Sequence, residues 1–347
     1  AQARLMPPWK AVTGFGRFQH ERRLSDEELQ LIDRWVESGT PQGPAVDMPP
    51  SPSFSEDWKL GEPDHVLVMP EEYTIRAEGE DDYRHFIIPT DFDRDIFVRA
   101  AEFVPGNRQS LHHVIAYVDT SGKARELDAA DPGPGYTRFG DVGFEPVSGL
   151  GGWAPGSQPD RAAAGTGFFL PKGADVVLQV HYYRTGRVEK DRTKFGIYFC
   201  DDPNPVAIDM GVAINHQFTI PADEQHYRVE ATWQIEEPVY AFGVAPHMHL
   251  LGTEMKVVAT LPDGHIEPVI WIKDWDFNWQ DFYRFEKPLL FPKGTKVDLV
   301  AYFDNSSENI NNPHDPPQPV SFGEKTTDEM CIAFVSFVKA DQWQPSE

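Results

Sequence analysis

Two histidines separated by a single residue, His247 and His249, have the spacing that most directly suggests chemistry in this sequence. In a regular β-strand alternate residues point to the same face, so both imidazoles would lie on one side, as chelation of one metal ion requires. Met248, between them, would then point the opposite way into packing. Imidazole suits copper, zinc, iron and nickel. By itself, the spacing is equally compatible with a metal site and with two unrelated strand histidines.

Three further histidines lie in apolar segments. His112 and His113 begin the run Leu111–Val118. Because adjacent strand residues face opposite sides, both can bind one ion only if the backbone bends there or if they lie at a strand edge. Otherwise one histidine belongs to the core and one to the surface. His181 lies within Val177–Tyr183, where a single histidine is more typical of a packed core than of a metal ligand.

Sulfur ligands are few. Met330 precedes an apolar strand and, taken alone, is typical of a core residue. The chain has two cysteines, Cys200 and Cys331, which excludes a dense disulfide framework and any four-cysteine zinc or iron–sulfur site. One disulfide between them and two separate buried thiols are both compatible with the sequence.

Taken in chain order, these motifs resemble those of the copper type II, ascorbate-dependent monooxygenases. The order is His-His, then a histidine inside a strand, then His-x-His, then the sequence Asp-Glu-Met-Cys that ends at Cys331. The segment Gly151–Gly156 is also similar to the family segment that precedes the third histidine. The likeness extends from about Ser55 to Lys339.

The resemblance implies two copper ions. The electron-transfer copper would be bound by His112, His113 and His181. The copper at which O2 binds would be bound by His247, His249 and Met330. The thioether of a methionine is a soft ligand that favours Cu(I), the state that must meet O2. In the family the two ions face each other across a water-filled cleft, and a substrate C–H bond is hydroxylated.

The chain departs from the family where the peptide-amidating members hold a substrate carboxylate. Their arginine two residues before His-x-His is Ala245 here, and their asparagine and tyrosine after the methionine are Ile332 and Phe334. The resemblance therefore implies an apolar organic substrate. The aromatic segment Lys273–Gln280 would either line the substrate side or form a turn with packed indoles. Because the animal members are rich in disulfides, the chain is more similar to a bacterial branch.

The elements that must position these residues are strands. Short runs rich in Val, Ile, Phe and Tyr alternate with Pro, Gly and Asp breaks, which is typical of an all-β protein. We expect a mainly β fold of two tandem antiparallel β-sandwich, jelly-roll-like domains, at 55–200 and 206–340, with a short helical N-terminal arm. The boundaries follow the linker Pro49–Ser53 and the break Asp201–Pro205.

The N-terminal section, residues 1–48, contains one amphipathic helix that begins after Ser25, with Glu28 completing a capping box. Together with the loop at Met6 it resembles the last part of a c-type cytochrome domain, in which such a methionine is a haem axial ligand. The sequence has no Cys-x-x-Cys-His, so haem c is expected only if a missing N-terminal half exists. A cytochrome or an ascorbate-like reductant would supply electrons, and the protein would be periplasmic or extracellular.

The net charge of −24 argues against a nucleic-acid partner. No apolar run approaches the ~20 residues of a transmembrane helix. Two hypotheses remain for the function. One is a copper-dependent monooxygenase that hydroxylates a C–H bond with O2. The alternative is a non-catalytic copper-binding or structural subunit of a larger redox complex, which the missing carboxylate anchor favours.

Overall fold

The structure is a computed structural model that describes residue 1 and residues 6–51, 58–79, 81–138, 141–155, 157–323 and 325–345. Strands account for 42% of the chain and helices for 7%, which confirms the mainly β prediction. Leu5, Gly156 and residues 52–57, which include the predicted start of the first β domain, lie outside the described residues.

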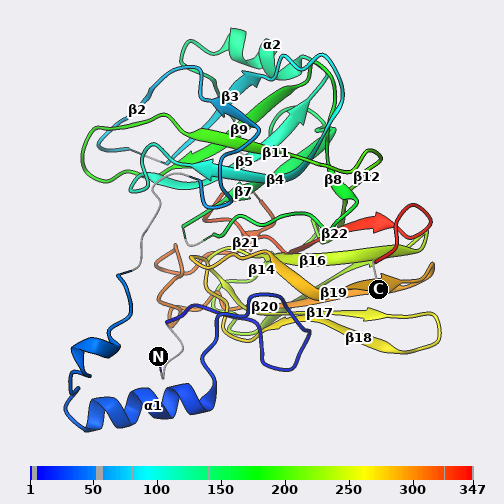
Figure 1. Cartoon of the computed structure of the whole chain (residues 1–347). Coiled ribbons are helices and arrows are strands. Elements are labelled where there is room, and N and C mark those ends of the chain that lie inside the picture. The colour runs from blue at the N-terminus through cyan, green and yellow to red at the C-terminus, as the bar shows by residue number, and fades with distance from the viewer. Residues whose placement is uncertain are drawn as a thin grey trace.

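Two five-stranded sheets make up the N-terminal half of the β region, the upper part of Figure 1. One has the order β1 (His65–Val68), β11 (Lys194–Phe199), β4 (Ile96–Val104), β8 (Thr166–Leu170) and β12 (Val206–Ala207). The other has the order β6 (Tyr136–Thr137), β3 (Asp82–Pro89), β9 (Asp175–Tyr182), β5 (Leu111–Asp119) and β7 (Ser148–Trp153). All eight residues of β9 are buried, as its continuous apolar run requires of a strand between two neighbours.

Two four-stranded sheets make up the C-terminal half. One has the order β13 (Asp209–Ile214), β22 (Ile332–Lys339), β16 (Val239–His247) and β19 (Tyr283–Phe291). The other has the order β15 (Tyr227–Gln234), β20 (Lys296–Phe303), β17 (Gly252–Thr260) and β18 (Ile266–Ile272). Two ribbons complete the strands: β2 (Tyr73–Ile75) with β10 (Glu189–Asp191), and β14 (Thr219–Ile220) with β21 (Val320–Ser321).

The prediction of two jelly-roll sandwiches is corrected to four small principal sheets in a propeller-like arrangement of four blades. Alternating patterns indicate which side chains face inward, but they do not show how strands distant in sequence pair. Each of the two large hydrophobic cores draws on two of these sheets, one pair in each half. A smaller cluster around Ile208, Phe242 and Trp343 joins the halves, and the Trp343 indole donates to the carbonyl of Ala164.

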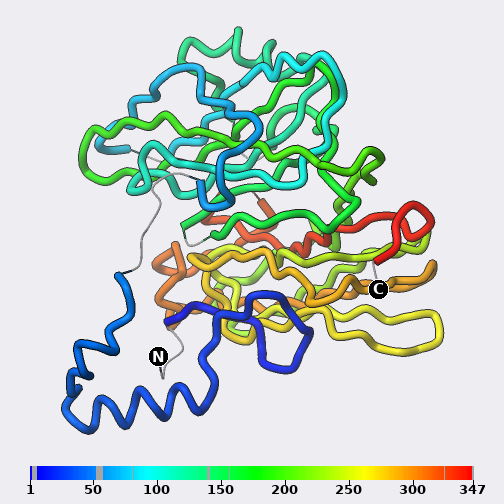
Figure 2. Tube along the Cα trace, in the orientation of Figure 1, coloured from blue at the N-terminus to red at the C-terminus, as the bar shows by residue number. Residues whose placement is uncertain are grey.

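The N-terminal arm lies along the C-terminal half, where the blue segment in Figure 2 runs beside yellow and orange strands. Ala11 and Phe18 belong to the C-terminal core. Helix α1 (Asp26–Glu37) begins with the predicted capping box at Ser25 and Glu28. The other helices are α2 (Lys123–Ala130) and a short 3₁₀ turn (Ala45–Asp47). Among the described residues, no helix has the length and apolar character needed to cross a bilayer.

Candidate metal centre

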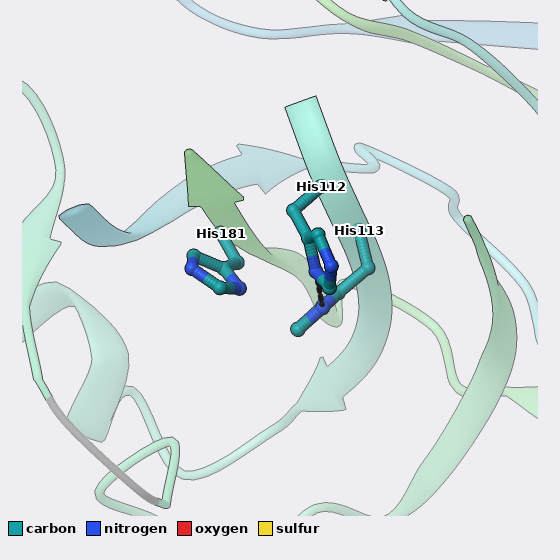
Figure 3. Close-up of side chains that lie close together, drawn as sticks. All are labelled: His112, His113 and His181. Atoms are coloured by element: carbon teal, nitrogen blue, oxygen red, sulfur yellow. Dashed lines mark hydrogen bonds between the residues drawn. The ribbon is translucent and has the colours of Figure 1, made fainter. Parts of the chain in front are cut away.

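Three histidines from two adjacent strands converge in the N-terminal half (Figure 3). In the pairing of β5 with β9, Leu111 lies opposite Tyr182 and His113 lies opposite His181, so His112 is an extra residue in β5. An extra residue of this kind is a β-bulge, which bends the strand and redirects a side chain. The bulge supplies the bend that the sequence required for two adjacent histidines to face one site.

The nitrogen atoms of these histidines form a site suited to a metal ion. One potential ligand atom from each residue lies within 4.8 Å of the others. The Nδ1 atoms of His112 and His113 are 3.2 Å apart. On His181, Nε2 lies 2.8 Å from the Asp81 carboxylate, whereas Nδ1 is buried and has no hydrogen-bond partner among the described residues. The ring of Tyr83 stacks on His181 at 4.2 Å and fixes its plane.

A buried ring nitrogen with no partner is costly unless something binds it. The Asp81 carboxylate can only accept a hydrogen bond, so it places the His181 proton on Nε2 and leaves the Nδ1 lone pair free. A soft-to-borderline cation bound by three imidazole Nδ1 atoms would give the Nδ1 atom of His181 a partner. The residues therefore fit a copper ion on the evidence of their own donor set.

Burial keeps two of the three histidines, His112 and His113, uncharged near neutral pH. Burial lowers the pKa of His112 to about 4, with a smaller contribution from His181 in the same direction. Burial also lowers the pKa of His113 well below the usual histidine range, and the neighbouring histidines of both halves act in the same direction. The hydrogen bond from His181 lowers the pKa of Asp81. Neutral imidazoles are the form that binds a metal.

The second histidine pair lies at the facing end of the C-terminal half. Strand β16 ends at His247, and His249 lies in the turn that follows, so the predicted placement of both on one strand is wrong. Met248 is fully buried in the core, as predicted. The rings of His247 and His249 are 5.1 Å apart, centroid to centroid. The turn achieves the convergence that was expected from strand alternation.

Each of these two rings is held by a hydrogen bond at its own Nδ1 atom. Nδ1 of His247 lies 2.5 Å from Oε1 of Gln280, and Nδ1 of His249 lies 3.0 Å from the carbonyl oxygen of Asp328. Because each partner atom only accepts, both Nδ1 atoms carry the proton and both Nε2 atoms keep a free lone pair. Burial lowers the pKa of His247 to about 4 and also lowers that of His249. Both are therefore neutral donors at pH 7.

Met330 is brought to this pair by a buried carboxyl group. Strand β22 pairs with β16 so that Ile332 lies opposite His247, which places Met330 just beyond the paired region. Oε2 of Glu329 accepts hydrogen bonds from the backbone N–H groups of both His249 and Met330. Met330 and His249 thus lie on two sides of one atom. Burial raises the pKa of Glu329 to about 8, although the backbone donors oppose the shift.

The sequence did not identify the supporting role of three residues that hold the candidate ligands in place: Asp81, Gln280 and Glu329. Glu329 had a signal, because an acid directly before an apolar strand and inside the Asp-Glu-Met-Cys motif needs partners when buried. Asp81 and Gln280 had none, since each is far from its histidine in the sequence.

The remaining candidate residues have varied positions. Met6 is 64% exposed. Cys200 and Cys331 are separate free thiols, so the disulfide alternative is wrong. Ala245 pairs with Phe334 in the sheet, so two of the three replaced anchor positions are neighbours.

Residues 206–345 match the sequence model of the family described as copper type II ascorbate-dependent monooxygenase, C-terminal domain. The match contains His247, His249 and Met330, and it supports the resemblance and copper dependence at the level of the family. No curated protein matches the chain.

Solved structures with some likeness include one of infectious bursal disease virus, Gx strain, at 9% identity and a TM-score of 0.23, covering 80% of this chain and 73% of that chain. Another is oxalate decarboxylase from Bacillus subtilis, at 9% identity and a TM-score of 0.15, covering 96% and 88%. At these scores the likenesses bear on neither fold nor function.

Proposed function

We propose that the protein is a copper-dependent monooxygenase that hydroxylates a substrate C–H bond with O2. Two observations carry the proposal. Three histidines converge around a buried Nδ1 that has no hydrogen-bond partner among the described residues, and His247 lies against His249, whose backbone shares a Glu329 oxygen with the backbone of Met330. The family match over residues 206–345 supports the copper chemistry.

The two histidine sets would have different roles, one in electron transfer and the other in binding O2. His112, His113 and His181 would hold a copper that only exchanges electrons, since three nitrogen donors suit either oxidation state. His247, His249 and Met330 would hold the other, where a thioether favours the reduced ion. When bound, copper supplies one-electron redox chemistry and activation of O2. In this view the two cores belong to two copper domains, the finer arrangement that the sequence predicted.

The chain's own residues orient and tune these donors. Asp81, Gln280 and the Asp328 carbonyl each fix a histidine tautomer, which leaves a defined nitrogen toward the site. Burial lowers the pKa values of His112, His113, His247 and His249, so no proton competes for their nitrogens near pH 7. Glu329 fixes the turn that carries His249 together with the backbone of Met330.

The substrate is proposed to be apolar. Ala245 and Phe334 form a sheet pair where the amidating relatives place groups that bind a carboxylate. An alanine and a phenylalanine there offer no charge partner for an anion, so an apolar contact is the only one they can make. An ascorbate-like reductant or a cytochrome would supply electrons, and we propose a periplasmic or extracellular location. Met6 as a haem ligand remains a proposal that requires a further haem-bearing segment.

The experiment is O2 uptake by copper-loaded protein with reductant and a panel of apolar substrates, with the hydroxylated product identified by mass spectrometry. His247→Ala and Met330→Ala should lose reductant-dependent product. His265→Ala is the matched control, because its side chain is 60% exposed and pairs only with Glu267 at the surface. Full turnover in His247→Ala would overturn the proposal. Copper binding without O2 consumption, together with stable association with a redox complex, would favour the non-catalytic alternative.

A further inference from the structure

The loop 273–282, between β18 and β19, connects the two histidine sets. The ring of Phe277 stacks on His112 of the N-terminal set, with centroids 5.7 Å apart and an interplanar angle of 20°. The same ring meets His249 of the C-terminal set edge-on, at 6.1 Å and 87°. One side chain therefore touches a candidate ligand of each site, in the space where the family resemblance implies a water-filled cleft.

The loop is also bound to the C-terminal histidines by hydrogen bonds. The buried indole of Trp275 donates to the carbonyl of His249 at 3.0 Å. Gln280 accepts from His247 with its oxygen and donates with its amide nitrogen to the carbonyl of Phe277, at 2.9 Å. The position of the Phe277 backbone is thus tied to the orientation of the His247 ring.

The N-terminal arm fastens both ends of this loop. At one end Lys10 pairs with Asp274 at 3.1 Å, and the N–H of Val12 donates to the carbonyl of Trp271 at 2.8 Å. At the other end Arg22 forms an ion pair with Asp281. The bridging loop is therefore held by contacts from a segment that precedes both β halves of the chain.

We propose that Phe277 is a positioning residue that bridges the two histidine sets and fixes the distance between them, on a loop fastened by the N-terminal arm. The inference rests on the proposed function for its consequence. His112, His113 and His181 would hold the copper that supplies one electron, the other set would hold the copper that gains it, and the external reductant would replace it. With the bridge in place, this exchange would need no movement of the two halves.

Three variants test the bridge. Phe277→Leu removes the ring and keeps an apolar side chain, whereas Phe277→Tyr keeps the ring. Phe282→Leu is the matched control, because Phe282 follows on the same loop and is 46% exposed. The first measurement uses metal-free protein: the NMR shifts of the His112 and His249 ring protons, which the Phe277 ring current perturbs. We expect them to change in Phe277→Leu and to stay near native values in Phe277→Tyr and Phe282→Leu.

The second measurement uses copper-loaded protein. Dipolar electron paramagnetic resonance gives the Cu(II)–Cu(II) distance, and stopped-flow reduction gives the rate of electron exchange between the sites. Phe277→Leu should bind both ions, show a longer or broader distance distribution, and exchange electrons about ten-fold more slowly, a barrier change of about 1.4 kcal/mol.

The outcomes separate the bridge from the function. Unchanged histidine shifts, or a native distance and rate in Phe277→Leu with both coppers bound, would overturn the bridge and leave the proposed function standing. A different result would overturn the proposed function and the electron-transfer role. In that case the native protein binds no copper, but the His112 and His249 shifts still change in Phe277→Leu, which shows that the Phe277 contact exists.

Discussion

Replacing Glu329 with glutamine should damage the C-terminal histidine set selectively. Glu329 is fully buried and accepts backbone hydrogen bonds from His249 at 2.9 Å, Leu251 at 2.6 Å and Met330 at 3.1 Å. Oε2 takes two of these bonds and Oε1 takes one. A glutamine can keep its carbonyl oxygen at the Oε2 position, but its amide group then meets the N–H of Leu251 donor to donor.

The cost follows from that single mismatch. One buried donor left without a partner costs about 1–3 kcal/mol. The free energy of unfolding of metal-free Glu329→Gln should fall by that amount in urea denaturation followed by tryptophan fluorescence at pH 9, where the native carboxyl group, with its pKa of about 8, is ionised and only accepts. Because the turn carrying His249 loses an anchor, copper at the C-terminal set should be lost before copper at His112, His113 and His181.

The control is Glu230→Gln, because the Glu230 side chain is 59% exposed and the change should lie within about 0.5 kcal/mol of native. Copper content after dialysis against a weak chelator reports on the two sites. If Glu329→Gln is as stable as native protein and retains both ions equally, the carboxyl group does not anchor the site and the reasoning is refuted.

Three further predictions concern residues outside the ligand set. Asp81→Ala should weaken copper binding at the N-terminal cluster about 10–100-fold in chelator competition, because His181 loses the acceptor that fixes its tautomer. An unchanged affinity would contradict this. Burial lowers the pKa of His85 to about 4. Between pH 6.5 and 4, the unfolded chain therefore binds a proton at His85 that the folded chain does not bind. His85 alone should therefore lower the free energy of unfolding by about 3 kcal/mol as the pH drops from 6.5 to 4, and His85→Gln should show a fall that is shallower by that amount in urea titrations across that range. Arg22→Ala leaves the largely buried carboxylate of Asp281 without its partner and should lower the unfolding free energy by about 1–3 kcal/mol. In limited proteolysis, the N-terminal arm should be cleaved faster in this variant than in native protein. Equal cleavage rates would show that the ion pair does not hold the arm in place.

Strands built from continuous or alternating apolar runs could be predicted closely. The apolar runs Lys194–Phe199 and Lys296–Phe303 coincide with β11 and β20. Strand β19 is harder to recognise in the sequence, because Lys287 and Pro288 interrupt its apolar pattern, and Pro removes a ladder donor. Sheet order was also beyond reach, because pairing of strands far apart in sequence leaves no local signal.

The candidate site was predictable in its residue types but not in its geometry. The sequence required a bend at His112 and His113, yet only the register against β9 shows that the bend is a bulge. His-x-His spacing indicated convergence, but the convergence comes from a turn after β16 rather than from strand alternation. Phe277 was among the aromatic residues considered for the substrate side. Its contact with both histidine sets depends on how the two halves pack, which no single segment encodes.

The central claim is that the chain holds two copper ions with different donor sets. X-ray absorption at the copper edge on the Cu(I)-loaded protein, together with metal analysis, tests this most directly. We predict two coppers per chain, with a sulfur scatterer from Met330 on one ion that disappears in Met330→Leu, and only nitrogen donors on the ion at His112, His113 and His181. Zinc in both sites of protein purified without added metal, or no bound metal after copper loading, would contradict the claim.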